Sequence, residues 1–154
     1  MFFRQVQHHG DNFSYIMADE ATREAAVVDP SFNAGEIIRV LKKENLKLKY
    51  VINTHDHSDH TAGNEELLST FSVKIVAHKL SRINVDVVVD GGDIIRVGNV
   101  RIKVIYTPGH TPDGICLLVD NKKLLTGDTL FVGECGRTDM FGGDSRSMYN
   151  SLFN

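Results

Sequence analysis

Short apolar segments alternate with polar turns along most of the 154-residue chain. Many of them are rich in β-branched and aromatic residues, which favour pleated strands. We predict single strands at 5–6, 15–18, 25–28, 48–53, 73–77 and 85–89. Two hairpins are predicted around the turns Gly98-Asn99 and Asp120-Asn121. Their strands are 94–97 with 100–106, and 115–119 with 122–126.

One longer segment carries its apolar residues at helical spacing. They form one stripe, and the helical pattern runs through Asn45. The apolar residues of the stripe are Ile37, Ile38, Val40 and Leu41. Asn33 followed by Glu36 is a capping pair typical of a helix N-terminus, so we expect the helix to begin there. Residues 65–68 predict a second, short helix, and residues 54–60 the loop that precedes it.

The last eight residues also have a helical pattern, with an apolar stripe formed by Met148, Tyr149, Leu152 and Phe153. We expect this stripe, Tyr149 included, to pack on the core. Neither a Gly nor a basic last turn follows it, although such residues usually close a helix. We therefore expect the chain to be truncated at its C-terminus, inside a helix.

Many strands with a few helices between them, and no Pro- or Ser-rich linker, predict a single α/β domain over residues 1–154. We expect two sheets packed face to face, with helices outside. Hydrophobic residues make up 42% and charged residues 24% of the chain, which excludes disordered and collagen-like classes. The oligomeric state stays open.

Charge and apolar content also limit the partners. The net charge is −3, and Lys and Arg do not cluster, so nucleic acid is not an expected partner. No apolar run approaches the roughly 20 residues that cross a bilayer, and residues 1–6 do not resemble a secretory signal. Two cysteines cannot form a disulfide framework in a chain of this size. We expect a cytoplasmic protein without a membrane span.

The chain has seven histidines, and three of them fall within the motif H-x-H-x-D-H at residues 55–60. Neutral imidazole and carboxylate groups that converge from one loop are typical ligands of zinc and similar metals. Residues two apart in an extended loop point the same way, so His55 and His57 can bind one metal. Asp59 and His60, beyond a bend, can face a second metal.

Two later turns supply further candidate ligands. The first, Thr107 to Thr111, places His110 in a tight turn directly after a predicted strand. The second, Leu124 to Thr129, places Asp128 at the end of another strand, where its two oxygens could bridge two cations. Each turn would be unremarkable alone, but beside the histidine motif both predict metal ligands.

These three motifs, in this order, resemble the metallo-β-lactamase superfamily. The resemblance covers essentially the whole chain and implies an αββα sandwich of two mixed sheets flanked by helices, with the metals at one edge. Within the superfamily, residues 130–139 resemble the branch of hydroxyacylglutathione hydrolases (glyoxalase II) and persulfide dioxygenases. This branch implies a small thiol-derived substrate.

The resemblance also implies how the ligands are shared. His55, His57 and His110 would hold the first metal, Asp59 and His60 the second, and Asp128 would bridge the two. Asp29 matches an Asp that supports the ligands from behind. A further histidine of the second site has no counterpart here, which agrees with the expected truncation. Zinc is the expected metal, with iron or manganese as alternatives.

The function expected from these residues is hydrolysis of a thioester by hydroxide formed from metal-bound water, since two cations acidify water and polarise a carbonyl. Asp59 would orient the hydroxide and carry its proton. One alternative uses His55, His110 and Asp128 alone as a mononuclear iron site, which suits a persulfide dioxygenase. A second alternative is a metal-binding domain without catalysis.

Two residues near the end of the chain have less certain roles. The resemblance implies that Arg137 binds the substrate, and its guanidinium could form a fork with a carboxylate. The alternative is a pair with Asp139 or Asp144 that holds the loop. Cys135 has no adjacent His in the sequence, so we expect a packed thiol and not a nucleophile.

Overall fold

A computed structural model of the chain describes residues 1–8 and 12–153. Two sheets pack face to face, as the sequence predicts. The larger sheet has six strands in sequence order: β1 (Phe2–Gln7), β2 (Phe13–Ala18), β3 (Glu24–Val28), β4 (Lys47–Ile52), β5 (Lys74–His78) and β6 (Val87–Val89). Its first three strands are antiparallel, and β3 to β6 are parallel.

The second sheet has the strand order β10-β9-β8-β7 and is antiparallel throughout its described strands. Its strands are β7 (Ile94–Val97), β8 (Val100–Tyr106), β9 (Ile115–Val119) and β10 (Lys123–Leu125). Both predicted hairpins are therefore confirmed, β7–β8 and β9–β10. The expectation that both sheets would be mixed is correct only for the six-stranded one.

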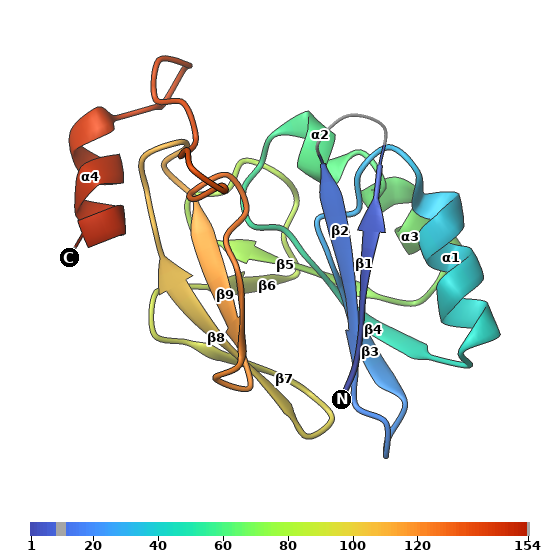
Figure 1. Cartoon of the computed structure of the whole chain (residues 1–154). Helices are drawn as coiled ribbons and strands as arrows, with labels where there is room; N and C mark the ends of the chain where they lie inside the picture. Colours follow the sequence, from blue (N-terminus) through green and yellow to red (C-terminus); the bar gives the residue numbers. More distant parts are fainter. Residues whose placement is uncertain (9–11, 154) are drawn as a thin grey trace.

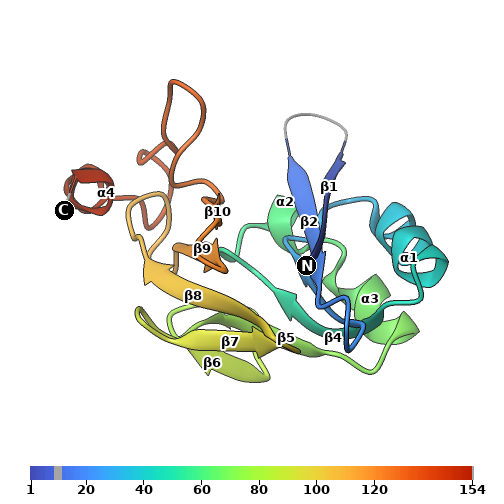
Figure 2. The same cartoon turned by 60° about the horizontal axis from the view of Figure 1, so that its bottom comes forward.

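The helices lie mainly on one side of the molecule. They are α1 (Ala34–Lys43), α2 (Ser58–Thr61), α3 (Asn64–Thr70) and α4 (Ser145–Phe153). Figures 1 and 2 show α1 and α3 on the outer face of the six-stranded sheet, and α4 beside the end of β8. No helix of the described residues is long and apolar enough to cross a membrane.

The apolar alternation of the strands produces two hydrophobic cores, one on each face of the six-stranded sheet. Val51 of β4 faces α1 and α3, whereas the next residue, Ile52, faces the four-stranded sheet. A strand that is buried on both faces reads as a continuous apolar run, which fits the second half of β4, Tyr50 to Ile52, whereas the exposed Lys47 and Lys49 alternate with Leu48 in its first half. Between the sheets, Ile52 packs in one cluster with Ile102 and Leu117 of the second sheet.

Several local predictions need correction. Asn33 precedes α1 but makes no side-chain capping hydrogen bond. Residues 58–61, expected to be loop, form the short helix α2. The predicted turn at 8–12 and the resemblance at Asp11 fall partly on residues 9–11, which lie outside the described residues.

The helix at the end of the chain is present, but its apolar stripe is not buried as predicted. Met148 is buried, whereas Tyr149 and Phe153 are 61% and 70% exposed, and their rings lie 4.9 Å apart on the surface. The expectation that Tyr149 packs into the core is wrong, because α4 contacts the rest of the molecule through the side of the helix that carries Met148 and Ser151, whose hydroxyl donates to the Pro108 backbone oxygen. That contact is close: a Cβ on Gly109 would lie 2.5 Å from the Met148 Cα.

Candidate metal centre

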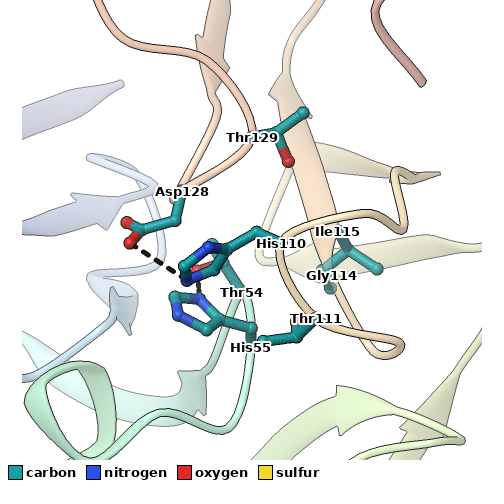
Figure 3. Close-up of a pocket in the computed structure, with 8 residues that line it drawn as sticks. All are labelled: Thr54, His55, His110, Thr111, Gly114, Ile115, Asp128 and Thr129. Atoms are coloured by element: carbon teal, nitrogen blue, oxygen red, sulfur yellow. Dashed lines mark hydrogen bonds and ion pairs between the residues drawn. The ribbon is translucent and has the colours of Figure 1, made fainter. Parts of the chain in front are cut away.

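The candidate ligands come from loops at the ends of three strands that belong to different sheets. His55 and His57 follow β4 of the six-stranded sheet, and His60 lies in α2 directly after them. His110 follows β8, and Asp128 follows β10, both in the four-stranded sheet. The sandwich therefore brings two sheets together at this edge, and Figure 3 shows His55, His110 and Asp128 turned toward one another.

Three imidazole nitrogens meet at the centre of this cluster. The Nε2 atom of His55 lies 3.2 Å from Nδ1 of His57, and Nε2 of His110 lies 3.0 Å from the same Nδ1 atom. His55 and His110 are buried, and His57 is partly buried. The ligand atoms of all three lie within 4.8 Å of one another.

The outer nitrogens of these rings have partners that determine where the protons are. His110 Nδ1 lies 2.8 Å from the backbone oxygen of Arg137, which can only accept, so Nδ1 carries the proton. His55 Nδ1 lies 3.2 Å from the Thr54 hydroxyl, and that hydroxyl donates its own proton to Asp29. We therefore assign the proton of both rings to Nδ1, which leaves an Nε2 lone pair directed at His57.

Asp29 supports the cluster from behind. Its carboxylate is buried and accepts three hydrogen bonds: from the Thr54 backbone N–H at 2.7 Å, from the Thr54 hydroxyl at 2.6 Å, and from His60 Nδ1 at 3.0 Å. One carboxylate thus orients His55, through Thr54, and His60 directly. Thr54 was not singled out in the sequence, although it stands next to the histidine motif.

A second group forms around His60 and Asp128. His60 Nε2 is buried without a hydrogen-bond partner and lies 3.2 Å from Asp128 Oδ1. The other oxygen of Asp128 lies 3.4 Å from His110 Nε2, so the two oxygens face two different histidines. Asp59 is farther out: its Oδ2 is 3.8 Å from His60 Nε2, and its side chain is 43% exposed.

Asp59 also has a partner that the sequence did not indicate. The Asn12 amide donates to Asp59 Oδ2 at 3.0 Å and to the Asp59 backbone oxygen at 3.2 Å. The two residues are 47 positions apart, so no local pattern could have joined them.

Burial and neighbouring charges divide the histidines into two classes. Burial, followed by the charge of His60, lowers the pKa of His55 well below its usual value, and burial also lowers the pKa of His57. Burial opposes the charge on His60 as well, but the carboxylates of Asp128 and Asp29 outweigh it and raise the pKa of His60 to about 10. Burial raises and His60 lowers the pKa of Asp128, with a net decrease.

The arrangement fits a bound cation. With the ring protons of His55 and His110 on Nδ1, two Nε2 lone pairs point at His57 Nδ1, and a single proton on that atom would have to be shared between them. A cation at this point can accept a lone pair from each ring, and burial lowers the pKa values of His55 and His57, which favours the neutral rings that metal ligation requires. The unpartnered Nε2 of His60 adds a further donor atom beside Asp128. The cavity at this point is lined by Thr54, His55, His110, Thr111, Gly114, Ile115, Asp128 and Thr129.

The structure places the two residues near the end of the chain differently from the main expectations. The Arg137 guanidinium forms a two-bond fork with Asp139, at 2.7 and 2.8 Å, which is the alternative that the sequence also allows. Cys135, expected to be packed, is exposed. It lies in a turn where Leu130 and Cys135 form an isolated bridge, so its side chain has no core to enter.

Comparisons with known proteins agree with this geometry. The family model described as "Metallo-beta-lactamase superfamily" matches residues 10–83 and 78–153. A hydroxyacylglutathione hydrolase of Pelagibacter ubique is 40% identical over 146 residues, 92% of this chain and 60% of that protein. The human mitochondrial persulfide dioxygenase ETHE1 is 34% identical over 143 residues, 91% of this chain and 56% of that protein.

Among solved structures, ETHE1 from Myxococcus xanthus superposes with a TM-score of 0.93 at 34% identity, covering 99% of this chain and 68% of that one. The chain spans about three fifths of the length of the curated relatives that it matches.

Proposed function

Because the chain belongs to the metallo-β-lactamase superfamily, we propose that it is part of a metal-dependent hydrolase whose cations lie in the cluster described above. The observation that carries the proposal is the convergence of three ring nitrogens, on His55, His57 and His110, whose lone pairs face one another. A single proton on His57 Nδ1 would have to be shared between the other two nitrogens, whereas a divalent cation can accept a lone pair from each of the three.

We assign the ligands as follows. His55, His57 and His110 would hold one cation and Asp59 and His60 a second, and Asp128, whose oxygens face His60 and His110, would be shared by both groups. Zinc suits such a set of imidazoles and carboxylates, and iron or manganese can replace it. When bound, the cations supply acidified water and a polarised carbonyl.

The substrate class proposed is a small thioester of the hydroxyacylglutathione type. The relatives of that name, at 37–40% identity, support it. The chain's own residues would prepare the site: Asp29 and the Arg137 backbone oxygen hold the Nδ1 protons of His60 and His110, so that Nε2 of each ring is the atom left for a cation, with His60 losing its second proton on binding. Asp59, exposed and held by Asn12, is placed to orient water and to accept its proton.

Arg137 is proposed to contact the acidic part of such a substrate. Its fork with Asp139 is exposed on both sides, at 65% and 68%, and exposed ion pairs contribute little free energy. A substrate carboxylate could therefore replace Asp139 at small cost.

Persulfide dioxygenase activity is the second candidate, and the superposition on the Myxococcus xanthus protein favours it. It would use His55, His110 and Asp128 around a single iron, a set of two imidazoles and one carboxylate that leaves positions open for dioxygen and a persulfide. A domain that binds metal without catalysis is the third possibility.

The test is a metal analysis of the untagged protein together with two assays. Two zinc-type ions and release of thiol from a hydroxyacylglutathione thioester support the hydrolase; one iron and oxygen uptake with a thiol persulfide support the dioxygenase. His55→Ala and His110→Ala should each remove bound metal, because an open site loses most of its affinity with one ligand gone.

Cys135→Ser serves as the matched control, since this exposed residue is outside the ligand set, and it should keep both metal and turnover. Full metal content in either histidine variant would overturn the site assignment. Metal without either turnover would leave the third possibility as the function of this chain.

A further inference from the structure

Asp56 stands between two candidate ligands but takes no part in the cluster. In an extended segment, alternate side chains point to opposite sides, so Asp56 points away from the side that His55 and His57 share. Its side chain is only 3% exposed and accepts three hydrogen bonds from a single residue, Arg82. The Arg82 backbone N–H and Nε donate to Oδ2 at 3.0 and 2.7 Å, and Nη2 donates to Oδ1 at 2.7 Å.

Arg82 belongs to the segment between β5 and β6, and its guanidinium faces two more segments. The ring of Phe141 lies 5.9 Å from the guanidinium carbon. The same stretch of chain includes Arg137, whose backbone oxygen fixes His110. Arg82 therefore touches the segment that carries His55 and His57 and lies over the one that orients His110.

The third segment that Arg82 faces carries His110 itself. Asp113, three residues later, is 2% exposed, and neither of its carboxylate oxygens has a hydrogen-bond partner. Its negative charge adds to that of Asp56 in raising the pKa of Arg82. Arg82 thus binds one buried carboxylate, Asp56, directly and lies within electrostatic reach of a second, Asp113, on the loop that carries His110.

We propose that Arg82 is a positioning residue for the three-histidine group: by holding Asp56 in a fork while its guanidinium lies over the ring of Phe141, it fixes the His55–His57 segment relative to the segment whose Arg137 backbone oxygen orients His110. This inference rests on the proposed function, because it concerns the same metal group. If the backbone of residues 55–57 rotated about the chain direction, the rings of His55 and His57 would both move away from His110. The fork between Arg82 and Asp56, on the opposite side of this segment, resists that rotation.

A purely stabilising role would give a different result. Arg82 is 62% exposed but Asp56 is only 3% exposed, so Arg82→Met leaves that carboxylate with the backbone N–H of residue 82 alone and should also lower the stability of the metal-free protein. In a purely stabilising role, the protein that stays folded would bind metal with parent-like affinity. Mutation of a residue that orients a metal ligand, in contrast, typically lowers the metal affinity about ten- to a hundredfold. Metal affinity and thermal unfolding of the metal-free protein therefore separate the two roles.

The experiment is a Co²⁺ titration of the metal-free protein against a chelator, followed by visible absorption, for the parent chain and for Arg82→Met and Arg82→Lys. Arg82→Lys keeps the charge but cannot form the fork. Arg39→Met is the matched control, because Arg39 is also an exposed arginine paired with a carboxylate, Glu36, on the distant helix α1.

We expect both Arg82 variants to weaken one of the two Co²⁺ binding steps about ten- to a hundredfold and to change its absorption spectrum, while Arg39→Met changes neither. In an Asp56→Asn background, Arg82→Met should have little further effect, because the two act through one contact. Parent-like affinity and spectrum in Arg82→Met would overturn the inference. Failure of the parent chain to bind Co²⁺ would instead overturn the proposed function.

Discussion

Replacement of Asp29 by Asn tests whether one buried carboxylate holds both halves of the cluster. In the parent chain its Oδ2 accepts from the Thr54 hydroxyl at 2.6 Å and from His60 Nδ1 at 3.0 Å, and its Oδ1 accepts from the Thr54 backbone at 2.7 Å. Asn has the same shape but one oxygen fewer. Whichever way the amide is turned, its NH₂ group faces a donor.

The size of the effect follows from these contacts. At least one hydrogen bond to a charged group is lost, at about 1.5–3 kcal/mol, and a buried donor is left unsatisfied, at about 1–3 kcal/mol. The free energy of unfolding should therefore fall by about 2.5–6 kcal/mol. A domain is usually stable by only about 5–15 kcal/mol, so the loss should be easy to measure.

The assay is urea unfolding of metal-free protein followed by circular dichroism, with the midpoint and slope fitted for each variant. Thr54→Val, which removes the hydroxyl but keeps the backbone donor and the carboxylate, should lose less than Asp29→Asn. Asp29→Asn should also weaken binding of Zn²⁺, because His55 and His60 both lose their orientation. A loss of stability below about 1 kcal/mol, or unchanged Zn²⁺ affinity, would refute the reasoning.

Three further changes have defined outcomes. The pKa of His60 is raised to about 10, so the His60 ring is doubly protonated in the metal-free protein at pH 7. Zn²⁺ binding at His60 should therefore release about one proton, and the affinity for Zn²⁺ should rise about tenfold per pH unit. Calorimetry in two buffers of different ionisation enthalpy can check the proton release. Gly136→Ala places a Cβ 1.8 Å from the Asp128 backbone oxygen, so Zn²⁺ content and melting temperature should both fall, and unchanged content would contradict the placement of Asp128. Burial raises the pKa of Asp113, so the folded state holds that proton more tightly than the unfolded chain does, and stability falls as the pH rises above 3.8. Asp113→Asn should consequently be more stable than the parent at pH 7 and lose this advantage near pH 3, whereas equal pH profiles in urea unfolding would contradict it.

The parts of the site that are close in the sequence could be predicted from it. His55, His57 and His60 lie within six positions, and their spacing alone placed them together before any fold was known. The strands were predictable for a similar reason, since alternation over four to six residues reflects which face of a sheet is buried.

Contacts between distant segments could not be predicted. The Asp56–Arg82 fork joins residues 26 positions apart, and either residue alone reads as an ordinary surface charge. The stripe on α4 shows the same limit: helical spacing groups Met148 with Tyr149 and Phe153, but it does not tell which of them meets another part of the protein. Asn33 likewise has a capping sequence without a capping bond, because the backbone at that position does not bring its side chain to the helix N–H groups.

The proposed ligands follow strands of two different sheets, so a growing chain makes the two halves of the site at different times. His57 and His110 are 53 positions apart, so a growing chain exposes the H-x-H-x-D-H motif well before it exposes the second half of the site. A cation captured early can be held by that motif only weakly, through two or three side chains of one flexible loop. Tight capture waits until the second sheet docks, and the bound ion then closes a loop of more than fifty residues, much as a disulfide would. Metal supply during synthesis would thus affect the last assembly step of this sandwich and not the first.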